Sequence, residues 1–549
     1  MRQTISGAEF QKLIINAAAS IEINKQALND LNVFPVPDGD TGTNMSMTIN
    51  AAANDLRRLE NPTLEQAANA AASAMLRGAR GNSGVILSLL FRGMSKRLKG
   101  ASTCDGVLWA KALQEGVDAA YKAVMKPAEG TILTVARLAA GKAQRAAREK
   151  NNFEYVHQAA IAEAKVALAN TINQNPVLKK AGVVDAGGKG WLVALEAMLL
   201  AVQGQEIVAP EASAAEVREQ ASFSDFDGEE ITFTYCTEFI ISRENNLNPE
   251  KLRNFLSSIG DSLVLVDDEE IIKVHVHTND PGKALHEAMD YGSFVTVKIE
   301  NMRLQHNDKV MGEQTQEQSA PEEEVPEIAE PEKALGVVSV CVGNGIAEVF
   351  KNLGVDGIIS GGQTMNPSTQ DILEVVHRVP AETVFVLPNN KNIIMAAQQV
   401  NALSPKNVVV IESKTIPQGI TAMLSFNPDG TIEENTEALT DALGTVETMQ
   451  ITYAARDSDF DGFLIHEGDY LAIWKGLFGT DRNIKVLLEG LAEKIRDEEK
   501  EYITIYYGAD ITKKEALQAA QIFQNICPDA DVNLINGGQP VYYYLISAE

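Results

Sequence analysis

Several features that mark familiar classes of protein are scarce or missing in this chain. Its 549 residues contain four cysteines (Cys104, Cys236, Cys341 and Cys527), which are scattered too widely for a disulfide framework and fit a reducing environment. Basic residues are also scarce: 47 Lys and Arg face 75 Asp and Glu, which leaves a formal net charge of −28. Because nucleic-acid phosphates are bound by clustered Lys and Arg, this balance argues against a nucleic-acid partner.

The chain also lacks a long hydrophobic run. The longest apolar helical stretch, Trp191 to Val202, is interrupted by Glu196 and falls short of the roughly 20 residues that cross a bilayer. The first residues lead into an amphipathic segment and not into the apolar core of a signal peptide. We therefore expect a cytoplasmic protein with no transmembrane segment.

Two common phosphate or calcium motifs are absent as well. No Gly-x-x-x-x-Gly-Lys-Ser/Thr sequence occurs, and the nearest stretch, 187–190, lacks its spacing and its hydroxyl. An EF-hand that began at Asp38 would need Gly and Glu where Thr43 and Ile49 stand. If the protein uses ATP, it is therefore not a P-loop enzyme.

The most informative stretch that is present is Asp38-Gly39-Asp40-Thr41-Gly42-Thr43-Asn44. In an extended segment, the carboxylates of Asp38 and Asp40 point the same way, and such hard oxygens suit Mg²⁺ bridged to phosphates. The glycines allow a tight turn, and the polar residues after it can cap a helix whose N-terminus attracts anions. The alternative is an ordinary Asp/Gly/Pro-rich surface turn.

Three further glycine-containing turns lie between expected helices, at 77–84, 126–131 and 184–190. The first places three glycines, an Asn and a Ser at a helix start, with Arg80 available for phosphate. Taken alone, each turn is as readily a flexible interhelical loop. Four such turns in one bundle, one of them with paired aspartates, favour a phosphate-binding site.

Residues 1–204 are expected to form an α-helical bundle of seven or eight helices. Apolar residues recur at three- and four-residue steps, and Thr63-Leu64-Glu65-Gln66 is a capping box before an Ala-rich helix. The unusual residues lie in the loops between helices. Function is therefore expected at one end of the bundle.

The rest of the chain divides into three segments. Residues 225–305 alternate strand and helix patterns, which predicts a small α+β middle domain. Residues 306–333 are rich in Glu and Pro and too polar to fold, so they are expected to be a linker. Residues 334–549 alternate apolar strand-like runs with helices, which predicts an α/β domain with a largely parallel sheet.

The C-terminal domain shows no catalytic set. Its Gly343–Gly345 turn follows a strand, but Glu348 stands where a dinucleotide fingerprint needs a third glycine. The loops 361–368 and 388–392 follow strand patterns and are of the kind that bind ligands in open α/β sheets.

A second candidate site lies in the middle domain. The alternation along 271–277 places His275 and His277 on one strand face, and Cys236 could add sulfur to a His₂Cys set for Zn²⁺. On spacing alone, two solvent-facing or mutually hydrogen-bonded histidines are the commoner outcome. Further candidate ligands nearby are Glu238 and Asp280.

The segments Asn32–Met45 and Ala79–Gly84 together resemble the ATP-binding domain of the dihydroxyacetone kinase family. The three-domain layout resembles the catalytic subunits of bacterial fatty acid kinases over essentially the whole chain. This resemblance implies an antiparallel helical barrel with ATP and two Mg²⁺ ions at one end. It also implies a C-terminal domain similar to DegV-type lipid-binding proteins.

The resemblance further implies roles for individual residues. Asp38 and Asp40 become Mg²⁺ ligands, and Asn32 could replace a third Asp that dihydroxyacetone kinases usually carry where Val33 stands here. Arg80 would stabilise transferred charge, with a structural salt bridge as the alternative. The implied nucleotide contacts are Thr41, Gly42, Thr43, Asn44, Gly81, Asn82, Ser83, Gly84, Asp185, Gly187 and Gly188.

The implied reaction is phosphoryl transfer from ATP to the carboxylate of a fatty acid, which gives an acyl phosphate. The acid would be presented by a separate fatty-acid-binding protein of the DegV family, and the kinase is expected to be a homodimer. Because a carboxylate is ionised at neutral pH, two metals and good positioning suffice without a strong base. Two alternatives stay open: a small-ketone kinase of the dihydroxyacetone type, and a non-enzymatic, nucleotide-switched lipid-binding regulator.

Overall fold

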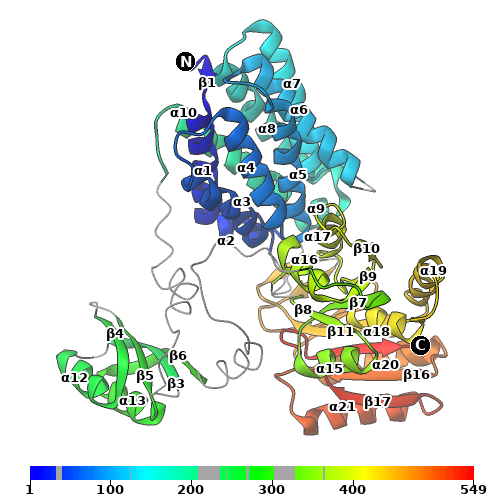
Figure 1. Cartoon of the computed structure of the whole chain (residues 1–549). Helices are drawn as coiled ribbons and strands as arrows, with labels where there is room; N and C mark the ends of the chain where they lie inside the picture. Colours follow the sequence, from blue (N-terminus) through cyan, green and yellow to red (C-terminus); the bar gives the residue numbers. More distant parts are fainter. Residues whose placement is uncertain are drawn as a thin grey trace. The chain divides into compact units, whose positions relative to one another are not determined.

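The computed structural model describes residues 1–32, 40–124, 127–207, 235–243, 245, 247–267, 271–301, 328–362, 365–460 and 462–549. The chain forms two compact units: Met1–Glu211 together with Val325–Glu549, and Ala212–Glu324 (Figure 1). No helix of the described part is long and apolar enough to cross a membrane.

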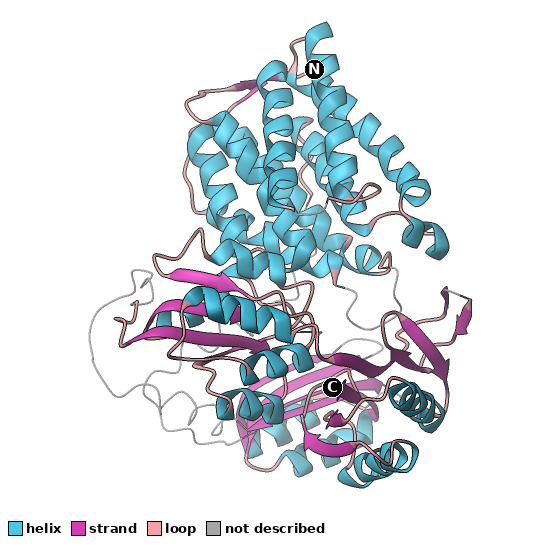
Figure 2. Ribbon diagram, turned by 90° about the vertical axis from the view of Figure 1, so that its right-hand side faces the viewer, coloured by secondary structure: helices cyan, strands magenta, loops and turns pink. Residues whose placement is uncertain are grey.

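The N-terminal part of the first unit is a helical bundle. Its long helices are α1 (Gly7–Ile23), α3 (Thr41–Arg57), α4 (Leu64–Arg77), α5 (Gly81–Leu98), α6 (Gly106–Ala123), α7 (Ile132–Glu149), α8 (Phe153–Gln174) and α10 (Ala186–Val202). Short elements complete it: α2 (Lys25–Asn29), α9 (Pro176–Ala181) and the paired strands β1 (Thr4–Ile5) and β2 (Cys104–Asp105). Helix α1 packs against α10 as well as α3, so the first and last helices close the bundle. Figure 2 shows the bundle as a group of long cyan helices.

Close helix packing in the bundle depends on small residues. A Cβ atom added at Gly93 of α5 would lie 2.3 Å from the carbonyl oxygen of Glu115. One added at Gly116 of α6 would lie 2.5 Å from the carbonyl oxygen of Leu90. Both distances are shorter than the non-bonded contacts that Cβ atoms make in proteins. These glycines therefore let α5 and α6 approach more closely than residues with a side chain would.

The described residues of the C-terminal part of the first unit form two main sheets and a separate two-stranded hairpin. The first has the order β10-β9-β7-β8 and is parallel throughout. Its strands are β7 (Lys333–Cys341), β8 (Gly357–Ser360), β9 (Ala381–Leu387) and β10 (Asn407–Val410), and its helices are α15 (Asn344–Asn352), α16 (Thr369–Arg378) and α17 (Ile394–Val400). Helix α17 contacts α5 of the bundle.

The second sheet differs from the expected parallel arrangement. Its order is β15-β14-β11-β18-β16-β17, and only β16 and β17 pair in parallel among its strands. Short turns can join only antiparallel neighbours, and β14 and β15 are joined in this way. The elements are β11 (Glu447–Tyr453), β14 (Tyr470–Ile473), β15 (Leu477–Asp481), β16 (Tyr502–Tyr507), β17 (Asp531–Asn536), β18 (Tyr544–Ala548), the hairpin β12 (Ser458–Phe460) and β13 (Phe463–Ile465), and helices α18 (Ile416–Leu424), α19 (Ile432–Ala442), α20 (Ile484–Asp497) and α21 (Lys513–Ile526).

The second unit is the small α+β domain that the sequence predicts. Its antiparallel sheet has the order β4-β5-β3-β6, with β3 (Tyr235–Arg243), β4 (Gly260–Asp267), β5 (Ile271–Thr278) and β6 (Gly292–Asn301). Helices α12 (Glu250–Ile259) and α13 (Pro281–Ala288), with the single turn η1 (Met289–Tyr291), supply Leu252, Leu256, Ala284, Ala288 and Tyr291 to its core. These side chains cluster with Phe239, Ile241 and Val274 of the sheet.

Candidate nucleotide and metal site

The first predicted motif lies at the start of α3. Asp40 is the N-cap residue, yet its side chain makes no capping hydrogen bond, so the carboxylate does not fold back onto its own helix. Asp38 lies outside the described residues. Of the predicted metal pair, the structure therefore describes the geometry of Asp40 alone.

Asn29, which the sequence analysis did not single out, holds the first turn of α3. Its Oδ1 accepts hydrogen bonds from the backbone amides of Gly42 (2.8 Å) and Thr43 (3.2 Å), and its Nδ2 donates to Thr43 Oγ1 (3.1 Å). A Cβ atom at Gly42 would lie 2.1 Å from the carbonyl oxygen of Lys25, so this glycine lets α2 pack closely. Two amides that were expected to face an anion are thus bonded within the protein.

Asn32, the predicted replacement for a third metal ligand, lies beside the same turn. Thr41 Oγ1 donates to Asn32 Oδ1 at 2.8 Å, which engages the oxygen that would coordinate a metal. The Nδ2 atom of Asn32 is buried without a partner among the described residues. Thr41 engages one of the two lone pairs of this oxygen, and coordination by Asn32 stays a prediction.

The second predicted turn, at the start of α5, lies directly against the first. Gly81 has φ +57°, a left-handed conformation that favours glycine, and an added Cβ would lie 2.3 Å from Nδ2 of Asn44. A Cβ at Gly84 would lie 2.3 Å from Oγ1 of Thr48, which also accepts from the backbone amide of Arg80 (3.3 Å). The structure therefore brings the starts of α3 and α5 together, with Asn82 and Ser83 in the first turn of α5.

The third and fourth turns are joined by Asp185. This residue caps α10 by accepting from the backbone amide of Gly188 (2.7 Å), and it also accepts from the amide of Ile132 at the start of α7. Burial raises the pKa of the Asp185 carboxyl to about 6, because the charged form loses its hydration. Gly187 and Gly188 pack against α7, where Cβ atoms would meet Ile132 and Val135 at 3.3 and 2.9 Å. Asp185 thus has a structural role in the described geometry.

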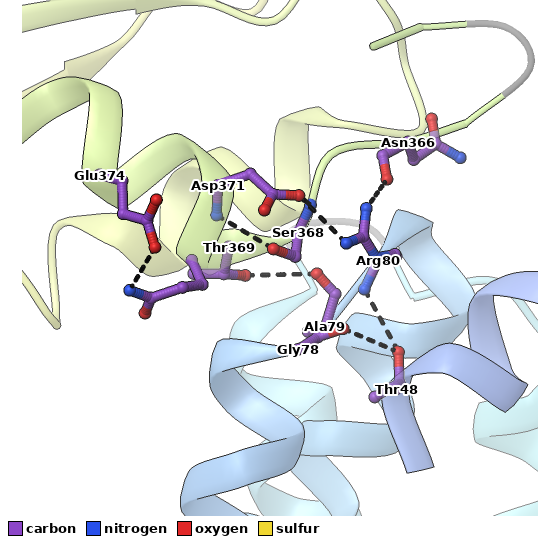
Figure 3. A network of polar contacts seen from close by, with 10 residues as sticks. Thr48, Gly78, Ala79, Arg80, Asn366, Ser368, Thr369, Asp371 and Glu374 are labelled. Atoms are coloured by element: carbon purple, nitrogen blue, oxygen red, sulfur yellow. Dashed lines mark hydrogen bonds and ion pairs between the residues drawn. The ribbon is translucent and has the colours of Figure 1, made fainter. Parts of the chain in front are cut away.

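A segment of the C-terminal part meets the second turn, which the sequence analysis did not foresee (Figure 3). Arg80 Nη1 donates to the backbone oxygen of Asn366 (2.8 Å), and Arg80 Nη2 lies 3.1 Å from Asp371 Oδ2. The backbone amide of Thr369 donates to the carbonyl oxygen of Ala79 (3.1 Å), and the Nδ2 of Asn366 donates to Asp40 Oδ2. The salt-bridge alternative for Arg80 is thus present in the structure. The only sequence feature that could have pointed to Asn366 is its position in the loop 361–368, which is of the kind that binds ligands in open α/β sheets.

Two buried side-chain oxygens in this part of the structure have the chemistry that suits a hydrated cation. The side-chain oxygens Oδ1 of Asn82 and Oδ1 of Asn366 are buried and accept no hydrogen bond from the described residues. Buried acceptors without donors are costly unless water or a cation meets them, and Mg²⁺ prefers oxygen ligands and retains waters. Among the described residues no group of three or more His, Cys, Asp or Glu side chains forms a metal site. A site here therefore requires amide oxygens, water or residues of the 33–39 loop.

The predicted middle-domain site is defined only by strand register. In the β3–β5 pair, Cys236 is opposite His277 and Glu238 is opposite His275. The side chains of Cys236, Glu238 and His275 lie outside the described residues, so the zinc site stays a prediction. Asp280, an alternative ligand, caps α13 through Lys283 N (3.1 Å) and pairs with Lys283 Nζ (2.6 Å).

Comparison with known proteins identifies the family. A DAK2 domain model matches residues 35–200, a model of the FakA-like fatty acid kinase middle domain matches 232–309, and one of the FakA-like C-terminal region matches 336–549. Protein YloV of Bacillus subtilis (strain 168) is 41% identical over 558 residues, which cover 100% of both chains. The chain belongs to the FakA-like fatty acid kinase family. This FakA-like protein is accordingly a multidomain kinase, that is, a phosphotransferase, with a DAK2-type helical domain at its N-terminus.

Solved structures similar to parts of this FakA-like chain were also found. A DegV family protein, Cg2579 from Corynebacterium glutamicum, has a TM-score of 0.32 and 16% identity and covers 39% of this chain and 97% of its own. The dihydroxyacetone kinase from C. freundii, in complex with AMP-PNP and Mg²⁺, has a TM-score of 0.29 and 20% identity. That match covers 36% of this chain and 35% of the other.

Proposed function

We propose that this kinase transfers the γ-phosphate of ATP, with Mg²⁺, to the carboxylate of a fatty acid and forms an acyl phosphate. The acid is presented by a separate fatty-acid-binding protein of the DegV family. The observation that carries the proposal is the meeting of the turns at α3 and α5, where Gly81 packs against Asn44 beside the uncapped carboxylate of Asp40. Membership of the FakA-like fatty acid kinase family supports the choice of acceptor.

In this proposal, Asp38 and Asp40 hold Mg²⁺, with Asn32 and the Oδ1 atom of Asn82 as further oxygens. The ions, when bound, neutralise charge between the γ-phosphate and the incoming carboxylate. Arg80 binds phosphate oxygens through its planar guanidinium, which holds the transferred group in line with its acceptor. A bond forms between the carboxylate oxygen and phosphorus while the bond to ADP breaks. No general base is required, because the acceptor is already ionised at neutral pH.

The rest of the proposed arrangement follows the division of the chain. The nucleotide contacts are placed at the first turns of α3 and α5, with Gly187 and Gly188 on the adenosine side and Asp185 stabilising the turn that carries them. The domains are residues 1–204, 225–305 and 334–549, with the acidic linker 306–333 between the last two. The proposal also includes a Zn²⁺ ion bound by Cys236, His275 and His277 in the middle domain. It further includes assembly of the kinase as a homodimer.

The decisive experiment measures transfer of ³²P from γ-labelled ATP with Mg²⁺ to oleate bound by a DegV-family partner protein. Asp40→Asn keeps the shape of the side chain but removes its charge, so acyl phosphate formation is expected to fall about 100-fold or more. Asp55→Asn is a matched control, because Asp55 lies on the same helix and pairs with Arg77 (3.0 Å). Its activity should stay near that of the wild type.

Other outcomes of this assay separate the alternatives. Labelling of dihydroxyacetone in place of oleate would assign the protein to the small-ketone kinases. Absence of transfer to either acceptor, with nucleotide still bound, would favour a nucleotide-switched regulator. Full activity of the Asp40→Asn variant would refute the metal assignment itself.

A further inference from the structure

Residues of the C-terminal part contact the chain on both sides of the predicted metal loop, residues 33–39. Before the loop, the guanidinium of Arg456 donates to the backbone oxygens of Asp30 and Asn32. After it, the Nδ2 of Asn366 donates to a carboxylate oxygen of Asp40, a residue 326 positions earlier in the chain. The two contacts come from different segments of the C-terminal part. The described residues before and after the loop therefore both contact the C-terminal part.

A third contact involves Arg80, the positively charged residue of the proposed site. The side chain of Arg80 is 17% exposed, and its guanidinium bonds both the backbone oxygen of Asn366 and the carboxylate of Asp371 (Figure 3). A backbone bridge between Arg80 and Ser368, with the Thr369–Ala79 hydrogen bond, fixes the register of this contact. The positive charge that would meet phosphate is thus already paired with a carboxylate of the protein.

Two of these contacts involve groups that a metal–nucleotide complex would use. The amide of Asn366 donates to one of the lone pairs of the Asp40 carboxylate, and Asp371 competes with phosphate for the Arg80 guanidinium. A phosphate that pairs fully with Arg80 must replace its ion pair with Asp371. Binding of the C-terminal part at these groups and binding of Mg-nucleotide should therefore weaken each other.

We propose that Asn366, Asp371 and Arg456 form an autoinhibitory clamp on the kinase site, which Mg-nucleotide must displace. The inference rests on the proposed function, since it takes Asp40 and Arg80 as the metal- and phosphate-binding groups. By linkage, the factor by which the clamp weakens nucleotide binding equals the factor by which nucleotide weakens the clamp. ATP binding thereby releases the C-terminal part, so the site opens to an acyl carrier only when the donor is loaded.

The competing interpretation gives Asn366 a positioning role. An amide that donates to a metal-bound carboxylate can orient that ligand, and nucleotide binding would then tighten the contact with Asp40. The Oδ1 of Asn366 is buried and accepts no hydrogen bond from the described residues, and it would in that case accept one from a metal-bound water. The two interpretations predict opposite responses of residues 366–371 to Mg-nucleotide.

Two variant pairs test the clamp in the full-length chain. Asp371→Asn removes the charge that pairs with Arg80 while keeping an oxygen for the Ser368 amide, whose bond to Asp371 is 2.7 Å. Its control is Glu374→Gln on the same helix, because Glu374 accepts a hydrogen bond from Gln370 (3.1 Å), one turn away on α16 (Figure 3).

The second pair replaces arginines. Arg456→Met removes the donors to the flank of the loop. Its control is Arg482→Met, because Arg482 pairs with Asp469 (3.2 Å) inside the C-terminal part.

Isothermal titration with Mg-ADP gives the first readout. The clamp variants should bind Mg-ADP about 5- to 20-fold more tightly than the wild type, within the usual range of coupling between sites. The control variants should match the wild type. Equal affinities in clamp variants, controls and wild type would overturn the clamp but leave the proposed function standing. If no variant bound Mg-ADP, the proposed function would fail and the clamp with it.

Hydrogen exchange of the wild-type chain gives the second readout. The Thr369 amide donates to Ala79, so peptides covering 366–371 should exchange faster when Mg-ADP is added. The capping box of Thr431 and Glu434 in α19 is an internal reference, which should not respond. Slower or unchanged exchange at 366–371 would overturn the clamp, and slower exchange would assign Asn366 the positioning role.

Discussion

Two aspartates at helix starts of the same bundle behave in opposite ways. Asp185 folds back onto α10, bonds the backbone amides of Gly188 and Ile132, and is half-buried. Asp40 makes no capping bond to α3, and its carboxylate instead accepts a hydrogen bond from Asn366, 326 positions later in the chain. The Asp185 carboxylate thus stabilises the start of its own helix, whereas the Asp40 carboxylate contacts another part of the protein.

The glycines beside these aspartates differ in the same sense. Gly187 and Gly188 follow Asp185 within α10, and they serve close packing against α7. Gly81 adopts a left-handed conformation at the start of α5, where it brings one turn against another. Glycines therefore serve helix packing at the start of α10, whereas at the start of α5 a glycine forms part of the candidate nucleotide-binding turn.

The largest expected effect separates the two aspartates by activity. Asp40→Asn should lower phosphoryl transfer about 100-fold or more, with thermal stability close to that of the wild type. Asp185→Asn should keep transfer within a few-fold, because Asp185 makes its described bonds to backbone amides of the protein itself. Parallel measurement of ³²P transfer and of thermal melting checks both halves. A collapse of activity in the Asp185 variant at unchanged stability would restore its predicted place on the adenosine side.

The next effect is a pH dependence that belongs to Asp185. Its pKa is raised from 3.8 to about 6, so between these values the folded state holds a proton that the unfolded state has lost. Stability should therefore fall as pH rises from about 4 to 6, by up to about 3 kcal/mol, and then level off. Urea unfolding of the wild type and of Asp185→Asn from pH 4 to 7.5 measures the difference. A difference that is constant over this range would contradict the assignment.

A third prediction compares the glycines by their effect on stability. Gly81→Ala places a Cβ in a left-handed conformation and 2.3 Å from Asn44 Nδ2, so we expect a loss of about 2–4 kcal/mol. Gly188→Ala, whose Cβ would lie 2.9 Å from Val135, should cost about 1–2 kcal/mol by overpacking.

Gly141→Ala provides the control for these two variants. Nothing lies within 4 Å of its Cβ position in α7, so it should stabilise the helix by about 0.5–1 kcal/mol. Urea unfolding ranks the three variants, and an equal loss in all of them would show that packing at the two turns plays no part.

Local patterns account for what could be predicted. The capping box at Thr63 and Gln66 is present as expected, because its hydrogen bonds join residues three positions apart. The helical bundle and the α+β middle domain follow from periodicity, which reports which face of an element is buried. The mainly antiparallel pairing of the six-stranded sheet was not predicted, since a strand's own residue pattern does not give the direction of the neighbouring strand.

The sequence by itself determined the family, the helical nature of the N-terminal part and the candidate metal loop, because these depend on neighbouring residues. Only the tertiary structure decided that Asn29 occupies the first amides of α3, that Asp185 also bonds the start of α7, and that Asn366 reaches Asp40. The physical reason is that a hydrogen bond depends on distance in space. Contacts between residues more than 300 positions apart leave no periodic mark on either segment.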